Sequence, residues 1–158
     1  MSNSRKSLSP LNIALFAFVL FLSFSASLTP VSAGAANQKS VLNAVNSIRI
    51  QFSLPPLQLH PSLQQAAQDQ AKLMAQTGKM AHKVKRGEGF KARLKRVGYR
   101  GLAAENIARG QRSLGKVLTG WLNSPGHRRN MLHPRMRYFG LAAAKSGGRN
   151  YWAMVLGG

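Results

Sequence analysis

The sequence predicts an α+β protein, or a three-layer arrangement of helices and sheet, folded as one domain. Apolar residues recur at helical spacings of three and four along the first part of the chain. Two strand-like runs, 138–144 and 150–156, close the chain and are joined by the hairpin signal Ser146-Gly147-Gly148. A length of 158 residues with 44% hydrophobic side chains is enough for one packed core.

Two helices are predicted first. Val41, Val45, Ile48 and Phe52 share one helical face, and the prolines of the segment 54–57 end that helix. A second helix begins at Pro61, where proline is favoured in the first turn, and ends at Gly78. Its predicted inward residues are Leu63, Ala67, Ala71 and Met74.

The second half of the chain alternates short helices and strands. A short helix is predicted over 90–97, and a strand or strand-like segment over 103–108. Ser113 is a suitable N-cap for a helix that turns Leu114, Val117, Leu118, Trp121 and Leu122 inward. The pair Ser124-Pro125 then starts a short helix that runs to Met131.

The N-terminal segment is typical of a secretory signal peptide. Arg5 and Lys6 precede an apolar run that begins at Ile13, and small residues follow Pro30. We expect cleavage after Ala33, so that residues 1–33 are the signal peptide and 34–158 the secreted or periplasmic domain. The alternative is an uncleaved membrane anchor, since the apolar run is long for a signal peptide. After cleavage no membrane span is expected.

Composition excludes several kinds of site. The absence of cysteine removes thiol catalysis, cysteine-ligated zinc and disulfide bonds. Three acids, Asp69, Glu88 and Glu105, cannot by themselves form a carboxylate-rich magnesium or calcium site. A Gly-x-Ser-x-Gly elbow and the phosphate-loop and dinucleotide-binding motifs are missing.

The charge balance points to an anionic partner. The chain has 23 Lys and Arg, 3 acidic residues and a net charge of +20. Without residues 1–33, which hold two of the basic residues, 21 basic and 3 acidic side chains leave a net charge of +18. For an exported protein the predicted partner is an anionic envelope polymer, a lipid or a protein. Nucleic acid also fits the charge but ranks last because of the export signal.

Two residues are candidates for chemistry on local grounds. Glu105 lies in an apolar run, so it is either a structural carboxylate bonded to backbone amides or a residue that lines a cavity. His127 lies in the first turn of a short helix, where the helix dipole and the basic surroundings favour a neutral imidazole. Such a ring can act as a base or metal ligand, or can simply pack.

Several segments, taken in order, resemble the CAP superfamily, also called the SCP or cysteine-rich secretory protein, antigen 5 and pathogenesis-related-1 family. The likeness covers residues 38–158 and is nearest to the cysteine-free bacterial secreted branch. The segments that carry it are Val45-Asn46-Ser47-Ile48-Arg49, Leu54-Pro55-Pro56-Leu57, Leu63 through Met74, Met80-Ala81-His82, Ala104-Glu105-Asn106-Ile107-Ala108, Trp121-Leu122-Asn123-Ser124-Pro125-Gly126-His127-Arg128, Gly140 and Tyr151-Trp152.

This resemblance implies a three-layer α-β-α sandwich with a central antiparallel sheet. It also implies a cleft lined by two histidines and two acids, which in some members binds zinc or another divalent cation. His82 matches the first histidine and Glu105 the first acid. Ser124 stands at the position of the second acid, and His127 is the candidate to replace the second histidine. The predicted cleft is therefore lined by His82, Glu105, His127 and Ser124.

The family's proposed roles include sterol or lipid binding, proteolysis and signalling. For this chain we favour a monomeric, non-enzymatic binding domain that uses a basic surface and the His/Glu cleft. The alternative is a metal-assisted, peptidase-like hydrolase that uses His82, Glu105 and His127, with a divalent cation such as zinc as its possible cofactor. As a sequence signal for zinc, these scattered residues are weak.

Overall fold

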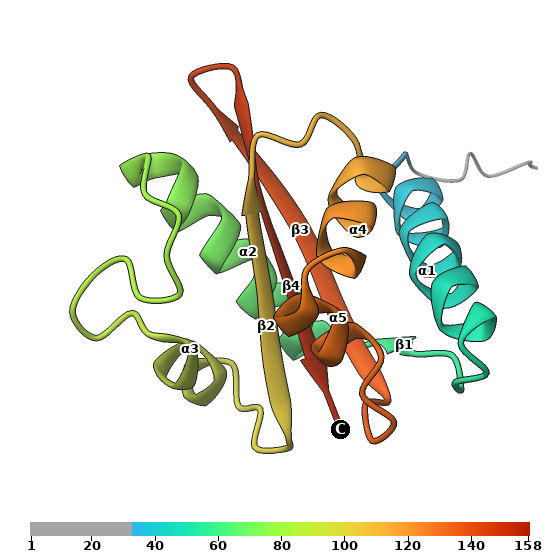
Figure 1. Cartoon of the computed structure of the whole chain (residues 1–158). Coiled ribbons are helices and arrows are strands. Elements are labelled where there is room, and N and C mark those ends of the chain that lie inside the picture. Colours follow the sequence, from blue (N-terminus) through green and yellow to red (C-terminus); the bar gives the residue numbers. More distant parts are fainter. Residues whose placement is uncertain (1–32) are drawn as a thin grey trace, which may run out of the picture. The chain divides into compact units, whose positions relative to one another are not determined.

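A four-stranded sheet forms the middle of the computed structural model, which describes residues 33–158, with side chains from Asn37 onward (Figure 1). The strand order is β1-β3-β4-β2. The strands are β1 (Gln58–Leu59), β2 (Ala103–Arg109), β3 (Tyr138–Ser146) and β4 (Arg149–Gly157). The three long strands are antiparallel, as predicted, and the turn at Gly147 and Gly148 joins β3 to β4.

A short fourth strand, which the sequence did not reveal, is added to the predicted antiparallel sheet. β1 pairs parallel with the beginning of β3, so the sheet is mixed. β1 has two residues because Pro55 and Pro56 come just before it and helix α2 begins directly after His60. So short a strand carries no period-two pattern by which the sequence could reveal it.

Alternating side chains of the central strand β4 divide the core into two layers. Trp152, Met154 and Leu156 pack with α1 (Ala33–Gln51), α4 (Leu114–Leu122) and α5 (Pro125–Met131). Tyr151, Ala153 and Val155 pack with α2 (Pro61–Thr77) and α3 (Phe90–Arg96) on the opposite face. The sheet therefore has helices on both faces, which confirms the predicted α-β-α sandwich (Figure 1).

Helix α2 lies directly against β3. The predicted inward residues Leu63, Ala67, Ala71 and Met74 are all buried, and Gly78 ends the helix with φ = 69°. At Gly140 a Cβ atom would overlap the backbone of Leu63 and Gln64. Glycine at this position is what allows the helix backbone to approach the strand so closely.

Phe52 departs from the predicted helical face. Val45 is buried, but α1 ends at Gln51 and Phe52 is 40% exposed. The guanidinium of Arg128 in α5 lies 4.7 Å from the centre of the Phe52 ring. Phe52 thus contributes a cation–π contact at the surface rather than a side chain in the core.

The predicted signal peptide falls almost entirely on residues 1–32, outside the described residues. Ala33, after which cleavage is expected, is the first residue of α1. In the described part of the chain, no helix combines the length and the apolar character needed to cross a membrane.

Candidate functional site

Strand β2 presents two polar side chains to opposite faces of the sheet. Successive residues of a strand point to opposite faces, so Glu105 faces α3 while Asn106 faces α5. Both residues are buried, with 6% and 0% of their surface exposed. Each therefore needs hydrogen-bond partners from a neighbouring element.

Both carboxylate oxygens of Glu105 are paired. Oε1 lies 2.8 Å from Nδ1 of His82, and Oε2 accepts a hydrogen bond from the Nη2 group of Arg93 in α3. The Glu105 and Arg93 side chains are 2% and 0% exposed, whereas that of His82 is 55% exposed. The arrangement is a buried ion pair that holds one exposed imidazole.

The backbone on both sides of the His82 ring is also fixed. Gln70, buried in α2, donates to the carbonyl of Ala81 at 2.6 Å. Arg93 donates through Nη1 to the carbonyls of His82 at 3.2 Å and Glu88 at 2.6 Å. A carboxylate accepts hydrogen bonds, so Nδ1 of His82 is the donor in this pair and Nε2 is the ring nitrogen left for other contacts.

His127 and Ser124 line a separate cavity of about 280 Å³ at the start of α5. Burial and, second, the nearby charge of His82 lower the pKa of His127 below its ordinary value of 6.5. The imidazole is therefore neutral at neutral pH, as the sequence predicts. The other residues that line this cavity are Met80, Ile107, Ala108, Arg109, Gln111, Val117, Gly120 and Trp121.

Asn106 connects β2 to α5. Its amide donates to the carbonyl of His127 at 3.1 Å, and its oxygen accepts from Asn130 at 2.8 Å. Trp121 adds a second connection by donating from Nε1 to the carbonyl of Ile107 at 3.2 Å. The Asn106 bonds hold the helix that carries His127 against the strand that carries Glu105, and the Trp121 bond holds α4 against the same strand.

The four predicted cleft residues thus fall into two groups. Ser124 and His127 line the 280 Å³ cavity, while His82 and Glu105 form a hydrogen-bonded pair and are not among its lining residues. The two groups are linked by the electrostatic effect of His82 on His127. Ser124 stands at the N-cap of α5 and makes no side-chain capping bond there.

Arg93 is the residue that the sequence interpretation missed. It is one of eight Lys and Arg residues between positions 83 and 100, and composition does not distinguish it from the others. Its spacing does, because Phe90, Leu94 and Val97 mark an apolar helical face on which position 93 also falls. A charged residue on a buried face signals a buried partner.

The residues present do not fit a three-ligand zinc site. Among the residues with described side chains, no three His, Cys, Asp or Glu side chains lie close enough together to hold a metal ion. Glu105 already faces the cation of Arg93, and a guanidinium beside a carboxylate repels a second cation. We therefore expect His82, Glu105 and His127, the candidate ligands for a divalent cation such as zinc, to bind zinc weakly, which metal analysis can test.

Comparison with known proteins agrees with this fold. Residues 42–156 match the cysteine-rich secretory protein family, CAP. The chain is 33% identical over 119 residues to the uncharacterized protein YkwD of Bacillus subtilis (strain 168), covering 73% of this chain and 46% of that protein. The chain thus spans about half the length of this relative.

Two solved structures are similar in fold. An extracellular protein containing an SCP domain from Bacillus anthracis str. Ames superposes with a TM-score of 0.69 and 24% identity, over 82% of this chain and 44% of that one. An outer surface protein from Borrelia burgdorferi superposes with a TM-score of 0.70 and 20% identity, over 77% of this chain and 92% of that one. The family match and the shared fold together show that the chain belongs to the CAP family of cysteine-rich secretory proteins.

Proposed function

We propose that this CAP domain is a non-enzymatic, extracellular binding domain that holds an anionic polymer of the cell envelope on its basic surface. The observation that carries the proposal is that all three acids face arginines of the same domain. Glu105 pairs with Arg93, while Asp69 and Glu88 lie 3.6 and 3.1 Å from Arg96. The other exposed Lys and Arg side chains are thus without carboxylate partners among the described residues, and they remain available to an external anion.

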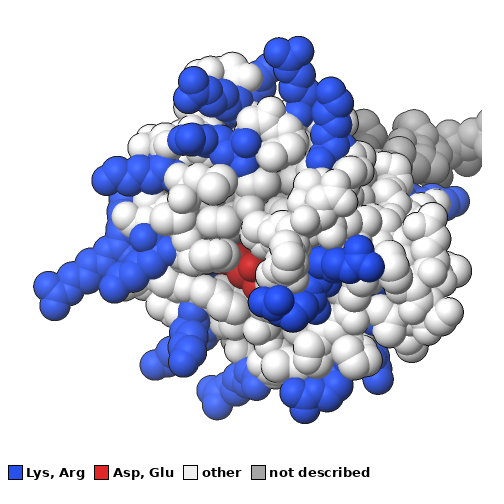
Figure 2. All heavy atoms as spheres, viewed as in Figure 1, with Lys and Arg blue, Asp and Glu red and all other residues white. Residues whose placement is uncertain are grey.

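Basic residues follow both histidines of the candidate site in the chain. We call six exposed residues the basic rim: three closely follow His82 in sequence, two directly follow His127, and one lines the His127 cavity. They are Lys83, Lys85, Arg86, Arg109, Arg128 and Arg129. In the view of Figure 2, Lys and Arg atoms surround most of the visible face, and the acidic atoms seen there among the described residues lie inside a hollow near its middle.

Two further observations support an extracellular role. The N-terminal sequence is typical of a secretory signal peptide. The similar solved structures include an extracellular protein and an outer surface protein by their own descriptions. A basic domain outside the cell meets anionic polymers and lipid headgroups of the envelope before it meets nucleic acid.

The hydrolase alternative has less support. It requires Glu105 to act as a base or metal ligand together with His82 and His127. Both oxygens of that carboxylate are engaged, one by a buried arginine, and so the group is poorly placed to accept a proton from water. We therefore favour binding over catalysis.

The experiment is a binding measurement on purified residues 34–158. Wall teichoic acid and phosphatidylglycerol vesicles serve as anionic probes, and phosphatidylcholine vesicles as the neutral control. We expect binding to the anionic probes that weakens as salt is raised, because exposed charges are screened. The variant Arg128→Gln/Arg129→Gln should weaken it more than Lys145→Gln/Arg149→Gln, a matched double change at the β3–β4 hairpin. Equal losses in the two variants, or binding insensitive to salt, would contradict the proposal.

A further inference from the structure

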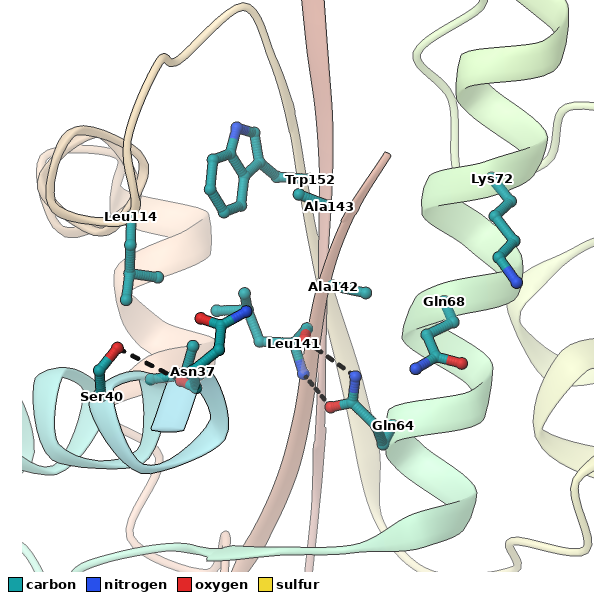
Figure 3. Close-up of a pocket in the computed structure, with 11 residues that line it drawn as sticks. Asn37, Ser40, Gln64, Gln68, Lys72, Leu114, Leu141, Ala142, Ala143 and Trp152 are labelled. Atoms are coloured by element: carbon teal, nitrogen blue, oxygen red, sulfur yellow. Dashed lines mark hydrogen bonds between the residues drawn. The ribbon is translucent and has the colours of Figure 1, made fainter. Parts of the chain in front are cut away.

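The outer side of β3 is open beyond its second residue. β1 pairs only with Tyr138 and Phe139, and past that point β3 has no neighbouring strand on the side away from β4 within residues 33–158. At Leu141 the side chain of Gln64 takes the place of a strand. Its amide donates to the Leu141 carbonyl and its oxygen accepts from the Leu141 N–H, both at 3.0 Å (Figure 3).

The register shows which main-chain groups continue this edge. In an antiparallel pair, residues alternate between bonding to the partner strand and pointing away from it. Leu141 points away from β4, so Ala143 and Lys145 do the same. The hydrogen bonds of the described residues include no partner for the outward N–H and C=O groups of these two residues. These outward main-chain groups of Ala143 and Lys145 can hydrogen-bond to one more strand.

A cavity of about 490 Å³ follows this edge and has two different walls (Figure 3). Gln68 and Lys72, one and two helical turns beyond Gln64 on α2, form the polar wall. The wall on the other face of the sheet is largely apolar and includes Val41, Leu114 and Trp152. The remaining lining residues are Asn37, Ser40, Gln64, Leu141, Ala142 and Ala143.

We propose that this edge binds an extended peptide of a partner protein, which adds as a strand beside Ala143 and Lys145. Side chains of an added strand point alternately to the two faces of the sheet. Those on the α2 face meet Lys72 and Gln68, and those on the other face meet Leu114 and Val41. The peptide that fits therefore alternates acidic and apolar residues.

The positive charge beside the edge favours an acidic partner peptide over a second copy of this chain. Lys72, Lys145 and Arg149 are exposed beside the edge or at its end. Two identical β3 edges brought together would bring these cations together as well, whereas an acidic peptide neutralises them. The site shares no lining residue with the His127 cavity, so this inference does not depend on the proposed polymer binding.

The test uses a fluorescein-labelled octapeptide of alternating glutamate and valine, with capped ends, and measures its Kd by fluorescence anisotropy. Ala143→Pro removes the outward N–H from an edge position where proline is tolerated, and should weaken binding about tenfold, as expected for lost strand hydrogen bonds. Lys72→Glu should weaken it comparably. The matched control Lys95→Glu, the same charge reversal on exposed α3, should have little effect.

Amide hydrogen exchange provides a second readout, which does not depend on the variants. Peptide binding should slow exchange at Ala143 and Lys145. The Ala142 amide, which already bonds to β4, should change little. A scrambled peptide of the same composition should bind more weakly, because it cannot present its acids to one face only.

Three results would overturn the proposal. One is a Kd unchanged by both Ala143→Pro and Lys72→Glu. Another is a loss of peptide binding in the Arg128→Gln/Arg129→Gln variant, which would place the peptide on the basic rim. The third is concentration-dependent dimerisation in sedimentation that Ala143→Pro abolishes, with no peptide binding, which would make the second copy the occupant.

Discussion

Arg93 of α3 donates a hydrogen bond to Glu105 of β2, and both side chains are buried. The same guanidinium also binds the carbonyls of His82 and Glu88. One arginine therefore neutralises the buried acid and fixes the loop that carries the exposed histidine. The cleft that the resemblance implies binds a divalent cation in some family members; in this domain the cation beside Glu105 is Arg93.

Removing Arg93 should be costly for stability. Arg93→Met leaves the buried Glu105 carboxylate without its arginine counter-charge, with only the His82 contact remaining, and we expect a loss of about 3–5 kcal/mol in the free energy of unfolding. Urea unfolding measures this loss. Arg96→Met, which removes only exposed pairs, should cost less than about 1 kcal/mol. Adding Glu105→Gln to Arg93→Met should recover part of the loss, because the buried charge is then gone. No such recovery would show that Arg93 stabilises through its packing and its bonds to the His82 and Glu88 carbonyls rather than through Glu105.

Zinc binding is predicted to be weak and independent of Glu105. Isothermal titration of the wild-type domain with zinc should show no stoichiometric binding, since Arg93 repels a cation at that carboxylate. His82→Ala and Glu105→Gln should titrate like the wild type. Tight binding with one zinc per chain that His82→Ala abolishes would restore the metal-site interpretation.

The lowered pKa of His127 predicts how stability depends on pH. The unfolded chain binds the His127 proton near pH 6.5, whereas the folded state binds it only at lower pH. Folding is therefore favoured above pH 6.5, and that contribution is lost as the pH falls through 6.5 toward the folded pKa. Urea unfolding between about pH 7.5 and about pH 5 should show a steeper loss of stability in the wild type than in His127→Gln. Parallel curves for the two proteins would contradict this prediction.

The contact between α2 and β3 predicts that alanine at Gly140 destabilises the domain. Alanine at Gly115, a helix glycine outside this contact, should have the opposite effect. Gly140→Ala forces a Cβ into the backbone of Leu63 and Gln64, and we expect destabilisation of at least about 1–3 kcal/mol. Gly115→Ala in α4 meets open space and should stabilise by about 0.5–1 kcal/mol through helix propensity. Thermal unfolding of the two variants is the measurement. A stable Gly140→Ala protein would mean that α2 can shift away from the strand.

Local signals in the sequence were sufficient for most of the secondary structure. The apolar spacing of Leu63, Ala67, Ala71 and Met74 predicted α2, because a helix has to bury one face. Pro61 predicted its beginning, since proline restricts the backbone, and Gly78 predicted its end, since glycine can adopt backbone conformations that other residues avoid. Such features depend on residues that are close in the chain, and the structure confirms them.

The candidate site could be predicted only in part. The sequence identified Glu105 and His82 through the family resemblance, and it predicted a neutral His127 from the helix start and the surrounding charge. It did not identify Arg93 as the partner of Glu105. That pairing joins α3 to β2 through tertiary packing, and the helical spacing of Arg93 indicates a buried side chain without indicating which acid it meets.

The sequence by itself determined the helices, the three long strands, the scarcity of acids and the excess of positive charge, because these follow from composition and local periodicity. Only the tertiary structure decided that each acid faces an arginine of the same domain, that β1 pairs parallel with β3, and that Gln64 occupies the edge at Leu141. The physical reason is that each of these contacts joins residues of different helices, strands or loops. Packing of helices on both faces of the sheet brings them together, and no local pattern encodes which partner each polar group meets.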